Sequence, residues 1–129
     1  MDISFIIDSM PRLLPGLLLT INLSLVGLGA AAIIGLPLGI FHTEIKSKIL
    51  RSIIDLYVFV VRGTPILVQL YAAYFLIPMT GLKISPFWTG IVALVFNSAG
   101  YQVEIARAAI LSIHDGQREG ARSLGLSKV

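Results

Sequence analysis

Long apolar stretches without charged residues dominate the pattern of this chain. They run over 13–43, 63–82 and 84–103. A bilayer core about 30 Å thick is crossed by roughly 20 apolar helical residues, so each stretch is long enough for a membrane span. We therefore expect three transmembrane helices, at about 13–41, 53–78 and 86–106.

The composition agrees with an integral membrane protein. Hydrophobic residues make up 56% of the 129 residues, charged residues make up 13%, and the mean hydropathy is +0.88. A cleaved signal peptide is the alternative for the first stretch, but that stretch is about twice the usual ~7–15 residues and has no basic start. The expected fold class is all-α, an integral membrane helical bundle.

Basic residues are distributed unevenly between the connecting segments. Arg12 alone precedes the first expected span, and Lys83 alone lies between the second and third. Four basic residues follow the first span, and four follow the third: Lys46, Lys48, Arg51 and Arg62, then Arg107, Arg118, Arg122 and Lys128. Because basic loops stay in the cytoplasm, the pattern predicts an external N-terminus and a cytoplasmic C-terminus.

Small residues recur every four positions in the first expected span. They are Gly27, Ala31, Gly35 and Gly39. This spacing places them on one helix face, where a neighbouring helix can approach closely. We interpret them as a helix-packing face.

The second expected span is interrupted by Arg-Gly-Thr-Pro at 62–65. We expect an interfacial helix over 49–61, a break, and a spanning helix from Pro65 to about Pro78. Thr64 is the expected cap of that second helix, because threonine is favoured at the cap and proline at the first helical position.

Polar side chains within the spans are candidates for a translocation path. Arg62 fits either a snorkelling residue at the cytoplasmic interface or a buried charge, and Gln69 fits either a helix-to-helix hydrogen bond or a ligand contact. Asn97, Tyr101 and Glu104 follow one another at spacings of four and three, which puts them on one face of the third span. That face should meet protein or water, either as a structural network between helices or as the lining of a path.

A short polar helix is expected at 117–124, after His114-Asp-Gly116 ends the preceding helix. Glu119 lies near its start, Arg122 lies near its end, and Gly125 is placed to cap it. Two helical turns alone are marginal in water. The segment is therefore either a solvated tail or a helix that docks into a partner through a small apolar face, formed by Ala121, Leu124 and Leu126.

Residues 101–127, YQVEIARAAILSIHDGQREGARSLGLS, resemble the cytoplasmic signature of binding-protein-dependent ABC importer permeases. That signature is a glutamate-alanine-alanine motif followed by a glycine, and Gly120 stands where alanine is usual. Two further stretches resemble the polar amino acid branch of the family, which includes histidine and glutamine permeases: LPGLLLTINLSL at 14–25 and VRGTPILVQL at 61–70. The resemblance covers nearly the whole chain in one register.

The resemblance implies a permease subunit of about five spans, of which this chain would contain the first three and a cytoplasmic coupling region at 107–127. The implied partners are a cytoplasmic ABC ATPase, a second permease subunit in a homo- or heterodimer, and an external solute-binding protein that delivers an amino acid. ATP and Mg²⁺ would bind to the ATPase, and no cofactor to this chain. The implied ATPase-coupling residues are Glu119, Gly120, Ala121, Arg122, Leu124 and Gly125.

The family signature continues beyond the point where this sequence stops. We therefore expect a fragment or a truncated reading frame that does not transport by itself. A small membrane-embedded interaction or scaffold subunit without transport activity is the alternative function. We expect no enzyme activity, because the sequence has no glycine-lysine phosphate loop and no pair of catalytic residues at helical spacing in the spans. We expect no metal site and no nucleic-acid partner either, since the histidines, His42 and His114, lack partners at metal spacing and the formal charge is only +3.

Overall fold

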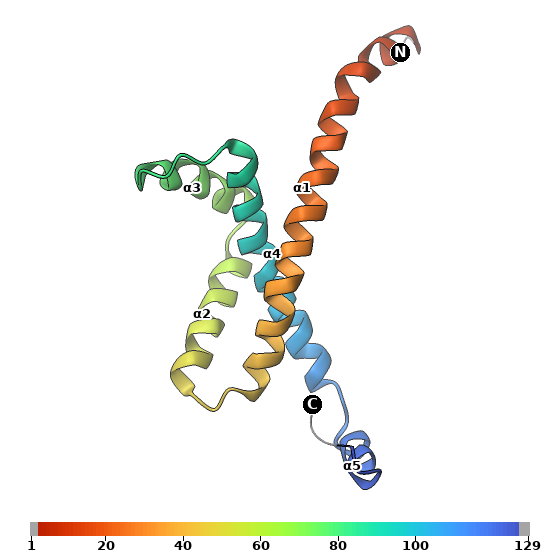
Figure 1. Ribbon diagram of the computed structural model, residues 1–129, viewed down its shortest axis with the longest axis vertical. Helices are drawn as coiled ribbons and strands as arrows, with labels where there is room; N and C mark the ends of the chain where they lie inside the picture. The colour runs from red at the N-terminus through yellow and green to blue at the C-terminus, as the bar shows by residue number, and fades with distance from the viewer. Residues whose placement is uncertain (1–2, 127–129) are drawn as a thin grey trace.

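The computed structural model describes residues 3–126, with side chains from Ser9 onward, and contains five α-helices in this range (Figure 1). They are α1 (Ile3–Glu44), α2 (Lys48–Gly63), α3 (Ile66–Met79), α4 (Pro86–Leu111) and α5 (Asp115–Ser123). The all-α fold expected from the sequence is confirmed. Ser127 and Lys128, which the sequence expectations included, lie outside the described residues.

The centre of the molecule is the crossing of α1 and α4, which lie against each other over a long contact (Figure 1). Glycines on α1 make this contact close. A Cβ added to Gly35 would lie 2.6 Å from the carbonyl oxygen of Ala99, and one added to Gly39 would lie 2.5 Å from that of Val103. The backbones of the two helices therefore touch, as small residues permit in membrane bundles.

The expected break in the second apolar segment is present between α2 and α3, which are bent by 106° relative to each other. The expected cap is wrong by one residue. Pro65 has an extended backbone and is itself the N-cap of α3, so the helix begins at Ile66. The hydroxyl of Thr64 instead donates to the carbonyl oxygen of Val60 at 2.8 Å and thereby completes the end of α2.

The helices differ in how well they qualify as membrane spans. In the described residues, α1 alone is long and apolar enough by itself, because an 18-residue stretch within Ser9–Glu44 has a mean hydropathy of 2.2. α2 and α3 are long and apolar enough for a membrane span only when they are taken together as one bent pair. α4 has 26 residues, which is enough to cross a bilayer, but it is not apolar enough to qualify in the same way.

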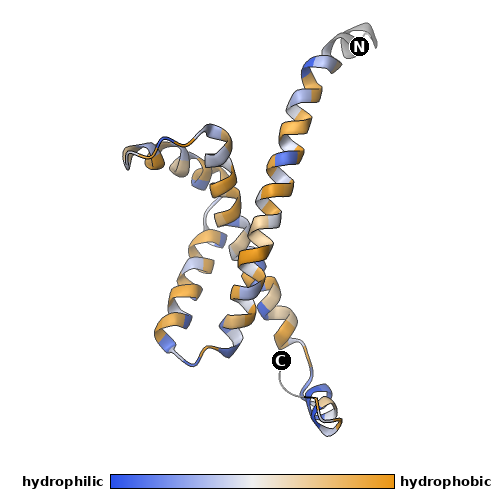
Figure 2. Cartoon of the chain, in the orientation of Figure 1, coloured by the Kyte–Doolittle hydropathy of each residue, from blue (hydrophilic) through white to orange (hydrophobic). Residues whose placement is uncertain are grey.

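Most of the large apolar side chains lie on the outside of the bundle, although Ile45, Ile54, Val58 and Val103 form a small buried core. Ile33 on α1 is 77% exposed and Phe59 on α2 is 75% exposed, whereas the inward-facing Val61 is fully buried. Figure 2 shows hydrophobic residues spread over α1 to α4 and hydrophilic residues on α5. Such surfaces are rare on soluble monomers and require lipid or further protein as their surroundings.

Candidate functional site

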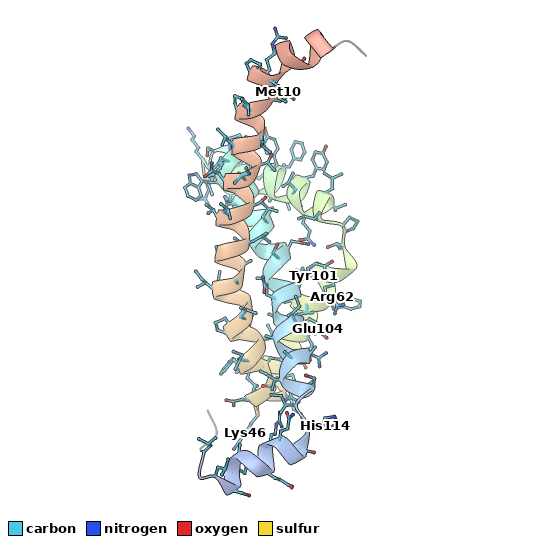
Figure 3. The ribbon with its side chains drawn as sticks, turned by 90° about the vertical axis from the view of Figure 1, so that its right-hand side faces the viewer. Met10, Lys46, Arg62, Tyr101, Glu104 and His114 are labelled. Carbon is cyan, nitrogen blue, oxygen red and sulfur yellow. The ribbon has the colours of Figure 1, made fainter. Side chains whose placement is uncertain are left out.

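Five polar residues singled out in the sequence lie together where α2, α3 and α4 meet. They are Arg62, Gln69, Asn97, Tyr101 and Glu104, and we call them the polar cluster. Figure 3 shows Arg62, Tyr101 and Glu104 close to one another, about halfway along the molecule. The sequence placed the last three on one helix face, but it could not bring Arg62 and Gln69 to that face. Packing of α2 on α4 brings Arg62 there, and the bend between α2 and α3 lets Gln69 reach it as well.

Gln69 is the centre of one half of the polar cluster. Its Nε2 donates to the carbonyl oxygen of Val61 at 3.0 Å and to Oγ1 of Thr64 at 2.6 Å. Carbonyl groups in the last turn of a helix lack partners within the helix, so this side chain from α3 satisfies the end of α2. Its Oε1 accepts a hydrogen bond from Nδ2 of Asn97 at 3.2 Å. Gln69 therefore holds the bent segment and joins it to α4.

Asn97 is deeply placed in an apolar helix, with 7% of its surface exposed. A buried amide without a partner would be costly, and the bond to Gln69 removes that cost. Among the described side chains, no buried nitrogen or oxygen atom lacks a hydrogen-bond partner. The interior of the bundle is thus polar at this point but fully paired.

Glu104 is the centre of the other half of the polar cluster. Its carboxylate accepts hydrogen bonds from Nη2 of Arg107 at 2.6 Å and from Nε at 3.1 Å. Nη1 of Arg62 lies 3.9 Å from the same carboxylate, and the Arg62 guanidinium lies 5.9 Å from the centre of the Tyr101 ring. Because the side chain of Arg62 is 48% exposed, its ion pair is the weaker of the two.

Arg107 is a member of this network that the sequence analysis assigned only to the tail. Its spacing of three residues from Glu104 on one helix was a usable signal, because residues three apart lie side by side on a helix. The two charges form a bidentate pair and largely neutralise each other. The polar cluster therefore presents Arg62, rather than Arg107, as its less engaged cation.

A second polar pair joins α1 and α2, near the end of the bundle that is expected to be cytoplasmic. Nε2 of His42 lies 2.9 Å from Oδ1 of Asp55, and His42 is only 5% exposed. Sequence reasoning missed this pair, because its members lie 13 residues apart on different helices and only the turn between the helices brings them together. In the described part of the chain, no group of three potential metal-ligating side chains surrounds it.

The four small residues of α1 face α4. Gly27, Ala31, Gly35 and Gly39 are all buried, and Ala31 has no exposed surface. A Cβ added to Gly27 would lie 3.1 Å from Cβ of Leu94, so the close contact extends along the helix beyond Gly35 and Gly39. These residues set the distance between the two central helices.

The expected coupling helix is α5, with corrected boundaries. It begins at Asp115, two residues before the expected start, and ends at Ser123. The earlier start follows from an extended His114, which is the N-cap, so that Asp115 lies in the first turn, where a negative charge is favourable. Gly116 lies inside the helix and does not break it.

The C-terminal end of α5 is closed by Gly125, which has a φ of +77°. The amide of Gly125 donates to the carbonyl of Arg122 at 2.9 Å, and the amide of Leu126 donates to that of Ala121 at 3.1 Å. This pair of bonds with a left-handed glycine is the Schellman motif. The residue type at 125 is therefore dictated by backbone conformation.

The surface of α5 is open. All its residues are exposed except the partly buried Ala121, and the following Leu124 is 82% exposed. Figure 3 shows α5 beside the end of the bundle that carries Lys46 and His114, opposite the end that carries Met10. A polar helix with an exposed leucine thus lies outside the apolar bundle.

Comparisons with known proteins agree with this arrangement. The sequence profile described as binding-protein-dependent transport system inner membrane component matches residues 35–129. The glutamine transport system permease protein of Escherichia coli (strain K12) is 40% identical over 129 residues, covering 98% of this chain and 58% of the relative. The arginine transport system permease protein of Bacillus subtilis (strain 168) is 42% identical over 130 residues, with the same coverage of 98% and 58%.

One solved structure shares the fold. A crystal structure of an amino acid ABC transporter with histidines superposes with a TM-score of 0.87 at 33% identity, over 98% of this chain and 59% of the other. The chain thus spans a little under three fifths of the length of these relatives, which are permease or transporter proteins by name. The chain belongs to the family of inner membrane components of binding-protein-dependent transport systems.

Proposed function

We propose that this chain forms part of the permease subunit of an ATP-driven amino acid importer. The observation that supports this most directly is the combination of two features in one fold. The polar cluster lies where three helices of an apolar bundle meet, and a separate polar helix, α5, lies outside the bundle. Relatives named for glutamine and arginine transport support amino acids as the class of solute.

In this proposal three segments cross the inner membrane: α1, the bent pair α2 and α3, and α4. The N-terminus lies outside and α5 lies in the cytoplasm. The basic residues support this orientation, because Lys46, Lys48 and Arg51 gather at the turn between α1 and α2. That turn and α5 lie at the same end of the molecule (Figure 3).

The polar cluster is proposed to border the solute path. Arg62 is the residue best placed to meet a solute carboxylate, since it is half exposed and only weakly paired with Glu104. The side-chain amides of Gln69 and Asn97 are hydrogen-bonded to each other, and that of Gln69 also donates to the end of α2. We therefore assign these two residues to holding the bend, and Arg62 and Tyr101 to the path itself.

The proposed partners follow from the exposed surfaces. α5 with Leu124 docks on a cytoplasmic ABC ATPase, which binds ATP and Mg²⁺, and the apolar outer face of the bundle meets lipid and a second permease subunit. An external solute-binding protein delivers the amino acid. The chain itself is assigned no cofactor. No observation on the described residues favours the alternative of a scaffold subunit without transport.

A chimera provides the test. This chain would replace the matching segment of the Escherichia coli glutamine permease in a strain that lacks that permease, and uptake of labelled glutamine would be measured. We expect the chimera to restore uptake. A chimera that inserts into the membrane and binds the ATPase but takes up no glutamine would contradict the proposal.

Two variants of the chimera distinguish residues of the solute path from residues that contact the ATPase. Arg62→Gln should lower uptake while ATPase binding in a pull-down stays unchanged, because Arg62 lies in the bundle and not on α5. Leu124→Asp should lower both, because it places a charge on the exposed apolar residue of the docking surface. Identical behaviour of the two variants would count against the assignment of separate roles.

A further inference from the structure

α5 is held to the bundle by very few contacts. It has nine residues, too few to be stable as an isolated helix in water, and it follows α4 after the three-residue connection Ser112, Ile113 and His114. Its own ends are closed by backbone hydrogen bonds, which fix its length but not its direction. Something outside the helix must therefore set its orientation.

The side chain of Arg118 joins α5 to α4. Its Nη2 donates a hydrogen bond to the carbonyl oxygen of Ile110 at 3.1 Å, eight residues earlier in the chain. Within residues 9–126, this is the one side-chain hydrogen bond that joins α5 to another helix. It bypasses the three-residue connection and ties the middle of α5 to the last turn of α4.

The last turn of α4 is well suited to receive a cation. Carbonyl groups there have no full set of helical partners, and the helix dipole makes this end negative. From the backbone, the carbonyl oxygen of Ile110 accepts only a long hydrogen bond of 3.4 Å, from the amide of Ile113. α4 also has no basic residue of its own in its last turn. Arg118 therefore supplies from α5 the positive charge that α4 lacks.

The position of α4 in the bundle gives this contact a consequence. α4 lies backbone to backbone on α1 at Gly35 and Gly39, so a displacement of its end is carried by two helices. The same helix carries Asn97 and Glu104 of the polar cluster. A rigid connection between α5 and the end of α4 would thus reach the polar cluster.

We propose that Arg118 is a positioning residue that clamps α5 to the C-terminal end of α4 and passes displacements of α5 to the α1–α4 pair. The consequence for transport rests on the proposed function of this chain, whereas the clamp itself does not. The planar guanidinium suits this role because its orientation is fixed when it donates to a carbonyl group. Lysine at this position would keep a donor but hold it less firmly.

Distance measurements between two spin labels test the clamp directly. The chain has no cysteine, so Ala108→Cys on α4 and Ser123→Cys on α5 give two unique labelling sites on exposed residues. The labelled 129-residue chain would be studied in lipid nanodiscs by pulsed electron paramagnetic resonance. We expect one dominant distance in the parent chain.

Three variants provide the comparison. Arg118→Gln should lower the population at the dominant distance relative to longer distances roughly fivefold, the effect of one hydrogen bond of typical strength. In Arg118→Lys, the population at the dominant distance should lie between those of the parent and of Arg118→Gln. Arg122→Gln, which removes the same charge from the same helix without touching α4, should match the parent.

An unchanged distance distribution in Arg118→Gln would overturn the clamp, and so would an equal change in Arg122→Gln. Loss of α5 helicity in Arg118→Gln, measured by amide hydrogen exchange, would also overturn it, because the clamp orients an intact helix. In the glutamine permease chimera, Arg118→Gln should reduce uptake while ATPase binding persists. An inactive parent chimera would count against the proposed function and leave the distance measurement standing.

Discussion

At the scale of single residues, the interior of this bundle is governed by two requirements: close backbone approach and full pairing of polar groups. Gly35 and Gly39 meet the first requirement against α4. Gln69 and Asn97 meet the second at the bend. Neither requirement involves large apolar side chains, most of which are exposed on the outside of the bundle. Such an interior is expected where lipid removes the usual advantage of burying leucine.

Gly35→Ala tests the close approach. The added methyl group would lie 2.6 Å from both the carbonyl oxygen of Ala99 and Cβ of Gln102, so α1 and α4 must separate. We expect a loss of about 1–3 kcal/mol in the free energy of unfolding, measured by denaturation in mixed micelles. Gly29→Ala is the matched control, because a Cβ there meets nothing within 4 Å and only gains helix propensity. Equal stability of the two variants would contradict the packing account.

Gln69 and Asn97 should be energetically coupled. We expect Gln69→Ala and Asn97→Ala together to destabilise the protein by less than the sum of the single variants, because either variant alone already breaks their shared hydrogen bond. Such bonds in membranes are worth about 0.6–1.7 kcal/mol. The measurement is a double-mutant cycle of unfolding free energies. Additive effects would show that the bond at 3.2 Å contributes no coupling.

At the scale of helices, the sequence predicted well that these segments are helical, and predicted less well at which residues the helices begin and end. The break expected at 62–65 was predictable, because proline cannot continue the hydrogen bonding of α2, but α2 continues to Gly63 rather than ending at Val61. The assignment of the cap to Pro65 depended on its extended backbone, which composition does not reveal. The start of α5 was missed by two residues, because His114-Asp-Gly116 reads as a turn although Asp115 and Gly116 are helical.

The polar cluster shows the same limit. Helical spacing was enough to place Asn97, Tyr101 and Glu104 on one face, since all three lie on α4. The contact of that face with Arg62 depends on the packing of α2 on α4, and its contact with Gln69 depends on the 106° bend. No periodicity in the sequence encodes either arrangement. The pair of His42 and Asp55 was missed for the same reason.

Gly125→Ala tests the end of α5. Because the φ of Gly125 is +77°, alanine there should cost about 1–2 kcal/mol and loosen the last turn of the helix. Gly120→Ala, inside the same helix with open space around it, should have the opposite effect, by about 1 kcal/mol. Amide hydrogen exchange of α5 would measure both. Equal protection of α5 in Gly125→Ala and the parent chain would refute the capping role.

At the scale of the whole molecule, the division of surfaces is the main result. An apolar outer surface covers α1 to α4, while α5 stands outside as a polar helix (Figure 2). Leu124, which directly follows α5, is 82% exposed. Membership of the transport family gives this division a meaning, because it places the bundle in the inner membrane. We propose that α5 is available to a soluble protein. The proposed contact between α5 and an ATPase is therefore the central claim.

Site-specific photo-cross-linking tests that claim most directly. A photoreactive amino acid would replace Leu124, which is 82% exposed next to α5, or Ile33, which is 77% exposed on α1, in cells that also produce the ABC ATPase. The account predicts a cross-link to the ATPase from position 124 and none from position 33. No cross-link from position 124, in a chain that is inserted in the membrane, would contradict it.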